Sequence, residues 1–141
     1  MFSFQSGCPI GWYAIANSCY MVSNGAMNTA TAIVRCRDEG GFLAVVTSAA
    51  ERDAIRSVLL SVNDFYVNID GSDAELEGTW KTQTGETMQN LPWQVGPNAD
   101  PAWSEPDGGT NENCLTMDTN QFADIRCNYI TSGALCELQL V

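Results

Sequence analysis

Residues 105–127 read EPDGGTNENCLTMDTNQFADIRC, and the rest of the chain is best understood outward from this stretch. It holds two cysteines, Cys114 and Cys127, and acidic residues on both sides of the first. The carboxylates of interest are Glu105, Asp107, Glu112 and Asp124. Oxygen donors of this kind suit calcium, which takes about six to eight oxygen ligands. Spacing alone leaves open whether they form a metal site or are solvated loop charges.

The cysteines extend this pattern over the whole chain. There are six, at positions 8, 19, 36, 114, 127 and 136, and none forms a CxxC pair. An even count without such a pair favours structural disulfides over zinc or redox chemistry, and it indicates a secreted, extracellular protein. A bridge between Cys8 and Cys19 would staple a short hairpin. Spacing alone does not fix the pairing.

Length and charge limit the function classes. The 141 residues suit one domain, which we expect at 8–141 after a tail at 1–7. The net charge of -11 disfavours nucleic acid and anionic membranes as partners. Histidine is absent, which removes the usual general base and the commonest zinc ligand. Glu105 and Asp124 could form a glycosidase pair, but nothing accompanies them that indicates a cleft, so we expect no enzyme.

Periodicity predicts an α+β fold with the helices first. Small and apolar residues at helical spacing predict a helix over 29–39, which Gly40-Gly41 ends. Ser48 with Glu51 forms a capping-box pattern that opens a second helix to about Val62. Its buried stripe would be Ile55, Val58, Leu59 and Val62. A hairpin is predicted over 8–22, and later strands near 65–69, 79–82, 114–117, 122–125 and 134–138.

Residues 83–113 form a long segment without a period. Loops of this length are either functional or disordered. Trp93 and Trp103 favour order, because a floppy loop has little reason to carry two large apolar side chains. A cis bond at Pro106 would turn Glu105 and Asp107 towards one point.

Several short motifs follow one another along the chain. In order they are Cys8-Pro9, Gly11-Trp12, Ser18-Cys19-Tyr20, Cys36, Gly40-Gly41-Phe42-Leu43-Ala44, Ser48 to Glu51, Tyr66-Val67-Asn68-Ile69, Gly78-Thr79-Trp80, Cys114, Cys127 and Cys136-Glu137. The ordered set resembles the long form of the C-type lectin domain family, from Cys8 to Leu138. The resemblance implies three disulfides, Cys8–Cys19, Cys36–Cys136 and Cys114–Cys127.

The resemblance also implies a calcium ion that coordinates two sugar hydroxyls. Its ligands here would be Glu105, Asp107, Glu112 and Asp124. Sugar contacts would come from Glu105, Asp107, Glu112 and Asn113, with Trp103 stacking on the sugar or packing as loop core. Two residues depart from the family pattern. Ala123 replaces an asparagine that would ligate calcium, and Phe122 replaces a tryptophan.

The sequence predicts the bound sugar less clearly than the calcium site, because Glu105-Pro106-Asp107 is neither of the two motifs that are common in the family. Two carboxylates offer only acceptors, whereas an amide beside a carboxylate offers a donor as well. Asp107 matches the galactose-type motif at its second residue, so galactose-type or N-acetylhexosamine sugars are favoured. Gly96-Pro97-Asn98 is an alternative alignment of the motif, but it lacks the acid before proline.

A second, auxiliary calcium ion in the family would need acids after the strand at 65–69. Asp73, Glu75 and Glu77 are candidates, but Gly108 stands where a further acid belongs, so this ion is not predicted.

The sequence therefore favours an invertebrate-like soluble lectin that recognises terminal sugars, as in innate recognition of microbes. The alternatives are a lectin that binds sugar without calcium, and an interaction or mineral-binding protein on the same fold. All six cysteines pair within the chain on this interpretation, so a dimer would be a non-covalent homodimer.

Overall fold

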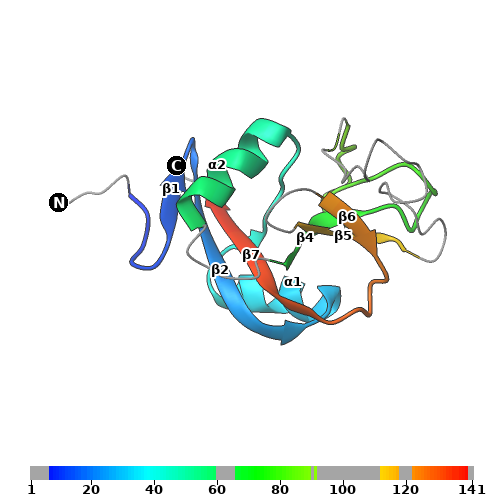
Figure 1. Cartoon of the computed structure of the whole chain (residues 1–141), viewed down its shortest axis with the longest axis horizontal. Helices are drawn as coiled ribbons and strands as arrows, with labels where there is room; N and C mark the ends of the chain where they lie inside the picture. The colour runs from blue at the N-terminus through cyan, green and yellow to red at the C-terminus, as the bar shows by residue number, and fades with distance from the viewer. Residues whose placement is uncertain (1–6, 60–65, 90, 92–111, 118–121, 140–141) are drawn as a thin grey trace.

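The computed structural model describes residues 7–59, 66–89, 91, 112–117 and 122–139. Its elements in chain order are β1 (Tyr13–Ile15), β2 (Ser18–Met27), α1 (Thr29–Asp38), β3 (Phe42–Leu43), α2 (Ala49–Leu59), β4 (Val67–Ser72), β5 (Cys114–Met117), β6 (Phe122–Ile125) and β7 (Thr131–Gln139). The strands form one sheet in the order β1-β2-β7-β4-β5-β6, and β3 pairs with β7. The α+β architecture expected from the sequence is confirmed, with two helices beside a mixed sheet (Figure 1).

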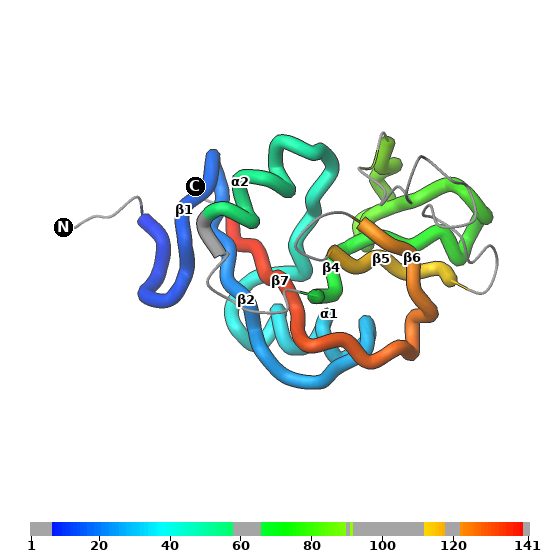
Figure 2. Tube along the Cα trace, in the orientation of Figure 1, coloured from blue at the N-terminus to red at the C-terminus, as the bar shows by residue number. Residues whose placement is uncertain are grey.

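The long pair β2–β7 joins the two ends of the chain. The register runs antiparallel from Ser18 opposite Gln139 to Met27 opposite Thr131. From β6 the chain crosses back over the molecule to begin β7, so β5 and β6 lie at the end away from β1 (Figure 2). The described residues 112–117 and 122–125 therefore lie at one end of the molecule.

Both helices begin at the residues that their sequences indicate. The Asn28 side chain caps α1 by accepting from the Thr31 N–H at 3.0 Å. Ser48 Oγ accepts from the Glu51 N–H at 3.1 Å, so the predicted capping box is confirmed, although the Glu51 carboxylate reaches back to the Thr47 N–H rather than to that of Ser48. Ile55 of α2 is buried, as predicted. The rest of its expected stripe lies outside the described side chains.

All three expected disulfides are present. Cys8 pairs with Cys19, Cys36 with Cys136, and Cys114 with Cys127. The first closes the β1–β2 hairpin, the second ties α1 to β7, and the third encloses β5 and β6. Covalent closure of this kind stabilises a small domain mainly by restricting its unfolded chain.

The strand expected over 79–82 is wrong. Within it, Lys81 makes only isolated bridges, one to Ser72 and one to Thr87. Gly78 turns the chain immediately before it with a φ of +85°, and Thr82 begins a further turn to Glu86. The turns on both sides therefore leave too few consecutive residues for a ladder of hydrogen bonds with a neighbouring strand. The two-residue strand β3 was not anticipated as a strand.

β4 carries one fully buried amide. Asn68 Nδ2 donates to Thr131 Oγ1 at 2.7 Å and to the Met27 carbonyl at 3.3 Å. Its Oδ1 accepts from Thr29 Oγ1 at 3.2 Å. This side chain therefore holds the end of β2, the start of α1 and the start of β7 together.

Candidate functional site

The hairpin of β5 and β6 carries the best-defined part of the expected site. Leu115 pairs with Asp124, and Cys114 pairs with Ile125, so Asp124 lies one residue pair away from Cys114. Glu112 and Asn113 directly precede β5. The Cys114–Cys127 disulfide holds the start of β5 close to the end of β6. The hairpin and the disulfide thus bring Glu112 and Asp124, which are distant in the sequence, to the same end of β5 and β6.

The loop after β4 brings a further carboxylate to the same end of the hairpin. The Asp73 N–H donates to the Asn113 carbonyl at 3.2 Å, which ties the two segments together. Asp73 Oδ2 accepts from the Gly78 N–H at 2.9 Å. Its other oxygen, Oδ1, is buried and accepts no hydrogen bond from the described residues. An acceptor that gives up water without a replacement costs free energy, so this oxygen is suited to a cation.

Glu77 lies near two buried carboxylates. Loss of water raises the pKa of Glu77, and the charge of Asp73, a side-chain hydrogen bond with Asp73 and the charge of Asp124 raise it further. Glu77 is exposed, whereas Asp73 and Asp124 are only 2% and 3% exposed. Like charges repel one another, and a bound divalent cation would remove that repulsion. We name Asp73, Glu77 and Asp124 the hairpin carboxylates.

Glu75 does not belong with them. Its Oε1 accepts from Lys81 Nζ at 2.9 Å, and this contact lowers the Glu75 pKa. The sequence offers Asp73, Glu75 and Glu77 as equal donors, whereas the structure separates one from the other two. The hydrogen bond between Asp73 and Asn113 orients this loop and so distinguishes the three acids. It is a tertiary contact that the sequence pattern does not reveal.

The two departures on β6 have different consequences. Phe122 is fully buried in the main hydrophobic core, where it fills the place of a larger aromatic ring. Ala123 is also buried, and its carbonyl accepts from Thr116 Oγ1 at 3.3 Å. Its methyl group has no donor atom for a metal. Position 123 is therefore still buried, but its side chain cannot bind a metal ion.

Glu105, Asp107 and Trp103 lie outside the described residues. Within the described part of the chain, no group of three or more acidic, cysteine or histidine side chains is close enough to hold a metal ion. The hairpin carboxylates thus supply charge and oxygen donors that fit a calcium ion, but the described side chains do not complete a coordination sphere.

This arrangement of disulfides, hairpin and helices has a match among known protein families. The model of the lectin C-type domain matches residues 25–138. The chain belongs to the C-type lectin domain family. Because this is a family of binding domains, the chain is a binding domain and not an enzyme.

Individual C-type lectin domains agree with this result. C-type lectin domain family 4 member M of Hylobates lar is 28% identical over 125 residues, which cover 86% of this chain and 29% of that protein. The mouse scavenger receptor C-type lectin carbohydrate-recognition domain has a TM-score of 0.79 at 25% identity, covering 96% of this chain and 100% of the other. An SPL-1–GlcNAc complex has a TM-score of 0.75 at 25% identity, covering 94% and 96%.

This C-type lectin domain spans less than a third of the length of its Hylobates lar relative. The relatives named here from a stated organism are vertebrate proteins, so the similarity does not support the invertebrate-like character expected from the sequence. None of the helices in the described ranges is long and apolar enough to cross a membrane.

Proposed function

We propose that this domain binds carbohydrate through a calcium ion held by Glu105, Asp107, Glu112 and Asp124. The observation that supports the proposal most is the β5–β6 hairpin, which together with the Cys114–Cys127 disulfide places the buried Asp124 beside the segment that carries Glu112. A bound cation would offset the cost of burying the charge of Asp124. Calcium is the ion that oxygen donors without histidine or cysteine favour.

Calcium at this site would supply coordination positions for two neighbouring sugar hydroxyls. The carboxylates that surround it would accept hydrogen bonds from the same hydroxyls, and Asn113 would contribute a further polar contact. Trp103 would offer an apolar face to the sugar ring. In this proposal Asp124 and Glu112 are oriented by the hairpin and its disulfide.

The ligand class we propose is a terminal galactose-type or N-acetylhexosamine sugar. Glu105-Pro106-Asp107 shares its second acid with the galactose-type motif of the family. The similar SPL-1 structure is a complex with GlcNAc, which is an N-acetylhexosamine. A secreted domain of this kind would recognise microbial surfaces, and a non-covalent homodimer would raise weak single-site affinity.

Ala123 favours one variation, in which sugar binds without calcium. The missing amide removes one ligand from the ion and one donor from the sugar. Sugar titrations in calcium and in chelator separate calcium-dependent from calcium-independent binding.

Calorimetric titration of calcium into chelator-treated protein tests the proposal. We expect one saturable site, and we expect Asp124→Asn to weaken it by about tenfold or more, which corresponds to about 1.4 kcal/mol. Asp38→Asn is the matched control, because Asp38 is an exposed acid on α1 and loses the same charge. Equal affinity in both variants would contradict the carboxylate site. Sugar binding that persists unchanged in chelator would assign the calcium-free mode.

A further inference from the structure

The far end of β2 contains the dipeptide Asn24-Gly25, which occurs once in the sequence. Both residues are exposed, and β1 pairs only with Ser18–Tyr20, so it does not cover them. Asparagine is a chemically labile residue. Its side chain is open to attack by the next backbone nitrogen, and a following glycine leaves that nitrogen unshielded because it has no side chain.

A β-bulge loosens the backbone at this dipeptide. The β2–β7 register shifts between Asn24 and Met27, so Gly25 and Ala26 both lie opposite Ser132 of β7. Two residues that face one cannot both pair with it, and the regular ladder is interrupted there. Gly25 has a φ of +140°, which residues with a side chain rarely adopt. The Gly25 nitrogen is therefore held less tightly than the nitrogens of the regular ladder.

Arg35 of α1 lies beside the peptide bond that joins the two residues. Its Nη1 donates to the Asn24 carbonyl at 3.5 Å and to Ser23 Oγ at 3.1 Å. The Asn24 carbonyl belongs to the same peptide unit as the Gly25 nitrogen. When this nitrogen loses its proton, resonance places part of the negative charge on the carbonyl oxygen. A guanidinium at that oxygen stabilises the anion, and so it promotes attack by the nitrogen.

We infer that Asn24 is a site of spontaneous deamidation in the folded protein. The Gly25 nitrogen gives its proton to a solvent base and forms a bond to Cγ of Asn24. The bond between Cγ and Nδ2 then breaks, and Nδ2 takes up a proton and leaves as ammonia. Water opens the resulting succinimide at either carbonyl, which gives aspartate or isoaspartate. The product carries one more negative charge than the unmodified chain.

Two other asparagines show what protection looks like in this fold. Asn28 Oδ1 accepts from the Thr31 N–H at 3.0 Å, which holds its side chain over the start of α1. Asn128 is exposed like Asn24, but the next nitrogen, that of Tyr129, donates to the Arg126 carbonyl at 2.9 Å. A nitrogen that donates in this way, beside a bulky side chain, is poorly placed to attack. Asn128 therefore serves as an internal control.

Deamidation should change the charge of the domain without unfolding it. Position 24 is at the surface, and the new carboxylate lies near Arg35, where an ion pair contributes little to stability. Isoaspartate lengthens the main chain by one carbon atom, and it does so at a bulge, where the register already shifts. The modified protein should therefore accumulate in folded form.

Incubation of the whole folded protein at mildly alkaline pH, followed by peptide mass spectrometry, tests this inference. We expect the peptide that contains Asn24 to gain the mass that replacement of NH₂ by OH gives, and to separate into aspartate and isoaspartate forms. The peptide that contains Asn128 should stay unchanged. Asn24→Gln should prevent the change at position 24, because the longer side chain closes a larger ring more slowly.

Arg35→Gln should slow the conversion about two- to fivefold, and Arg35→Lys, which keeps the charge, should restore most of the rate. Arg37→Gln is the matched control, because Arg37 is an exposed cation on the same helix, and it should leave the rate unchanged. Asn24 that stays intact in the folded protein but converts in the reduced, urea-unfolded chain would overturn the inference, because the fold would then protect the dipeptide. Equal slowing in Arg35→Gln and Arg37→Gln would overturn the part assigned to Arg35.

Discussion

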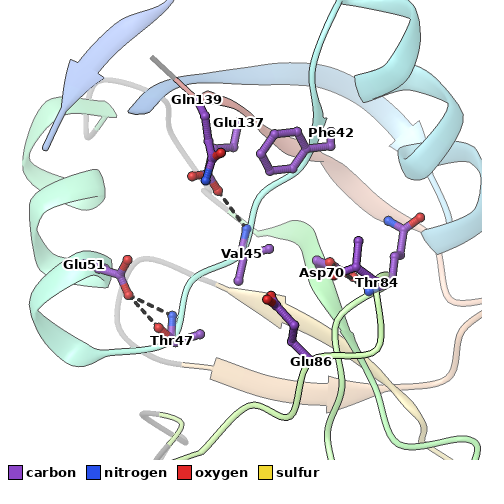
Figure 3. Close-up of a pocket in the computed structure, with 10 residues that line it drawn as sticks. Phe42, Val45, Thr47, Glu51, Asp70, Thr84, Glu86, Glu137 and Gln139 are labelled. Carbon is purple, nitrogen blue, oxygen red and sulfur yellow. Dashed lines mark hydrogen bonds between the residues drawn. The ribbon is translucent and has the colours of Figure 1, made fainter. Parts of the chain in front are cut away.

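Two pairs of buried carboxylates, Asp70 with Glu137 and Asp73 with Asp124, form two sets that differ in how their oxygens are used. In the first set, Glu137 of β7 accepts hydrogen bonds from Ser18 and Val45 (Figure 3), and Asp70 of β4 accepts one from Gln83. At the hairpin, Asp73 keeps one buried oxygen that accepts nothing from the described residues. The first set is satisfied by the fold and contributes to it, whereas the second set is left incomplete. The same residue type thus serves structure in one place and is available to a ligand in the other.

Glu137→Ala should give the largest effect on stability. It leaves the Val45 N–H and Ser18 Oγ without their charged acceptor, so we expect a loss of about 3 kcal/mol in the free energy of unfolding. Urea denaturation measures this. Calcium affinity should be unchanged, because Glu137 lies outside the hairpin. A parallel loss of calcium binding would show that the two sets are not independent.

Asp73→Asn should reduce the stabilisation by calcium without lowering the stability of the calcium-free protein. In chelator the variant should be at least as stable as the wild type, because a buried and incompletely satisfied charge is removed. The wild type should gain about 2.7 kcal/mol at calcium concentrations of about 100 times Kd, and the variant should gain much less. Thermal unfolding with and without calcium measures both. A large loss of stability in chelator would mean that Asp73 is already satisfied.

Asp70→Asn tests the first set through the pH dependence of stability. The pKa of Asp70 is raised to about 6 in the folded protein from an ordinary value of 3.8, so the folded state holds its proton more tightly than the unfolded state. Wild-type stability should therefore rise as the pH falls through 6, and this contribution is complete below about 4. Relative to Asp70→Asn, the gain between pH 7 and pH 4 should be on the order of 2 kcal/mol. Parallel curves for the two proteins would contradict the shift.

Glu75→Gln should have the smallest effect. Glu75 forms an exposed pair with Lys81, and such pairs contribute about 0.5 kcal/mol or less. Calcium affinity should stay within about twofold of the wild type, whereas Glu77→Gln should lower it more, because Glu77 faces Asp73 and Asp124. Calcium titration of the two variants compares them directly. Equal losses would place Glu75 in the site as well.

The fold could be predicted from local signals and from an ordered set of motifs. The end of α1 follows from Gly40-Gly41 and the start of α2 follows from the Ser48–Glu51 box, because these signals act within a few residues of the chain. Disulfide pairing did not follow from spacing and came only from the resemblance. The strand expected over 79–82 was wrong because strand formation depends on a partner that the local sequence does not contain.

The candidate site was predicted less completely. Glu112 and Asp124 were selected through their neighbouring cysteines, and the structure places both beside the Cys114–Cys127 disulfide, whereas their role as calcium ligands stays a prediction. Asp73 could not be separated from Glu75, since the choice depends on the contact with Asn113.

Titration of N-acetylglucosamine and galactose into calcium-loaded and chelator-treated protein tests the central claim most directly. The account predicts saturable binding of at least one of these sugars with calcium, and loss of that binding in chelator and in Asp124→Asn. Sugar binding of equal strength in calcium and in chelator, or none in either, would contradict it.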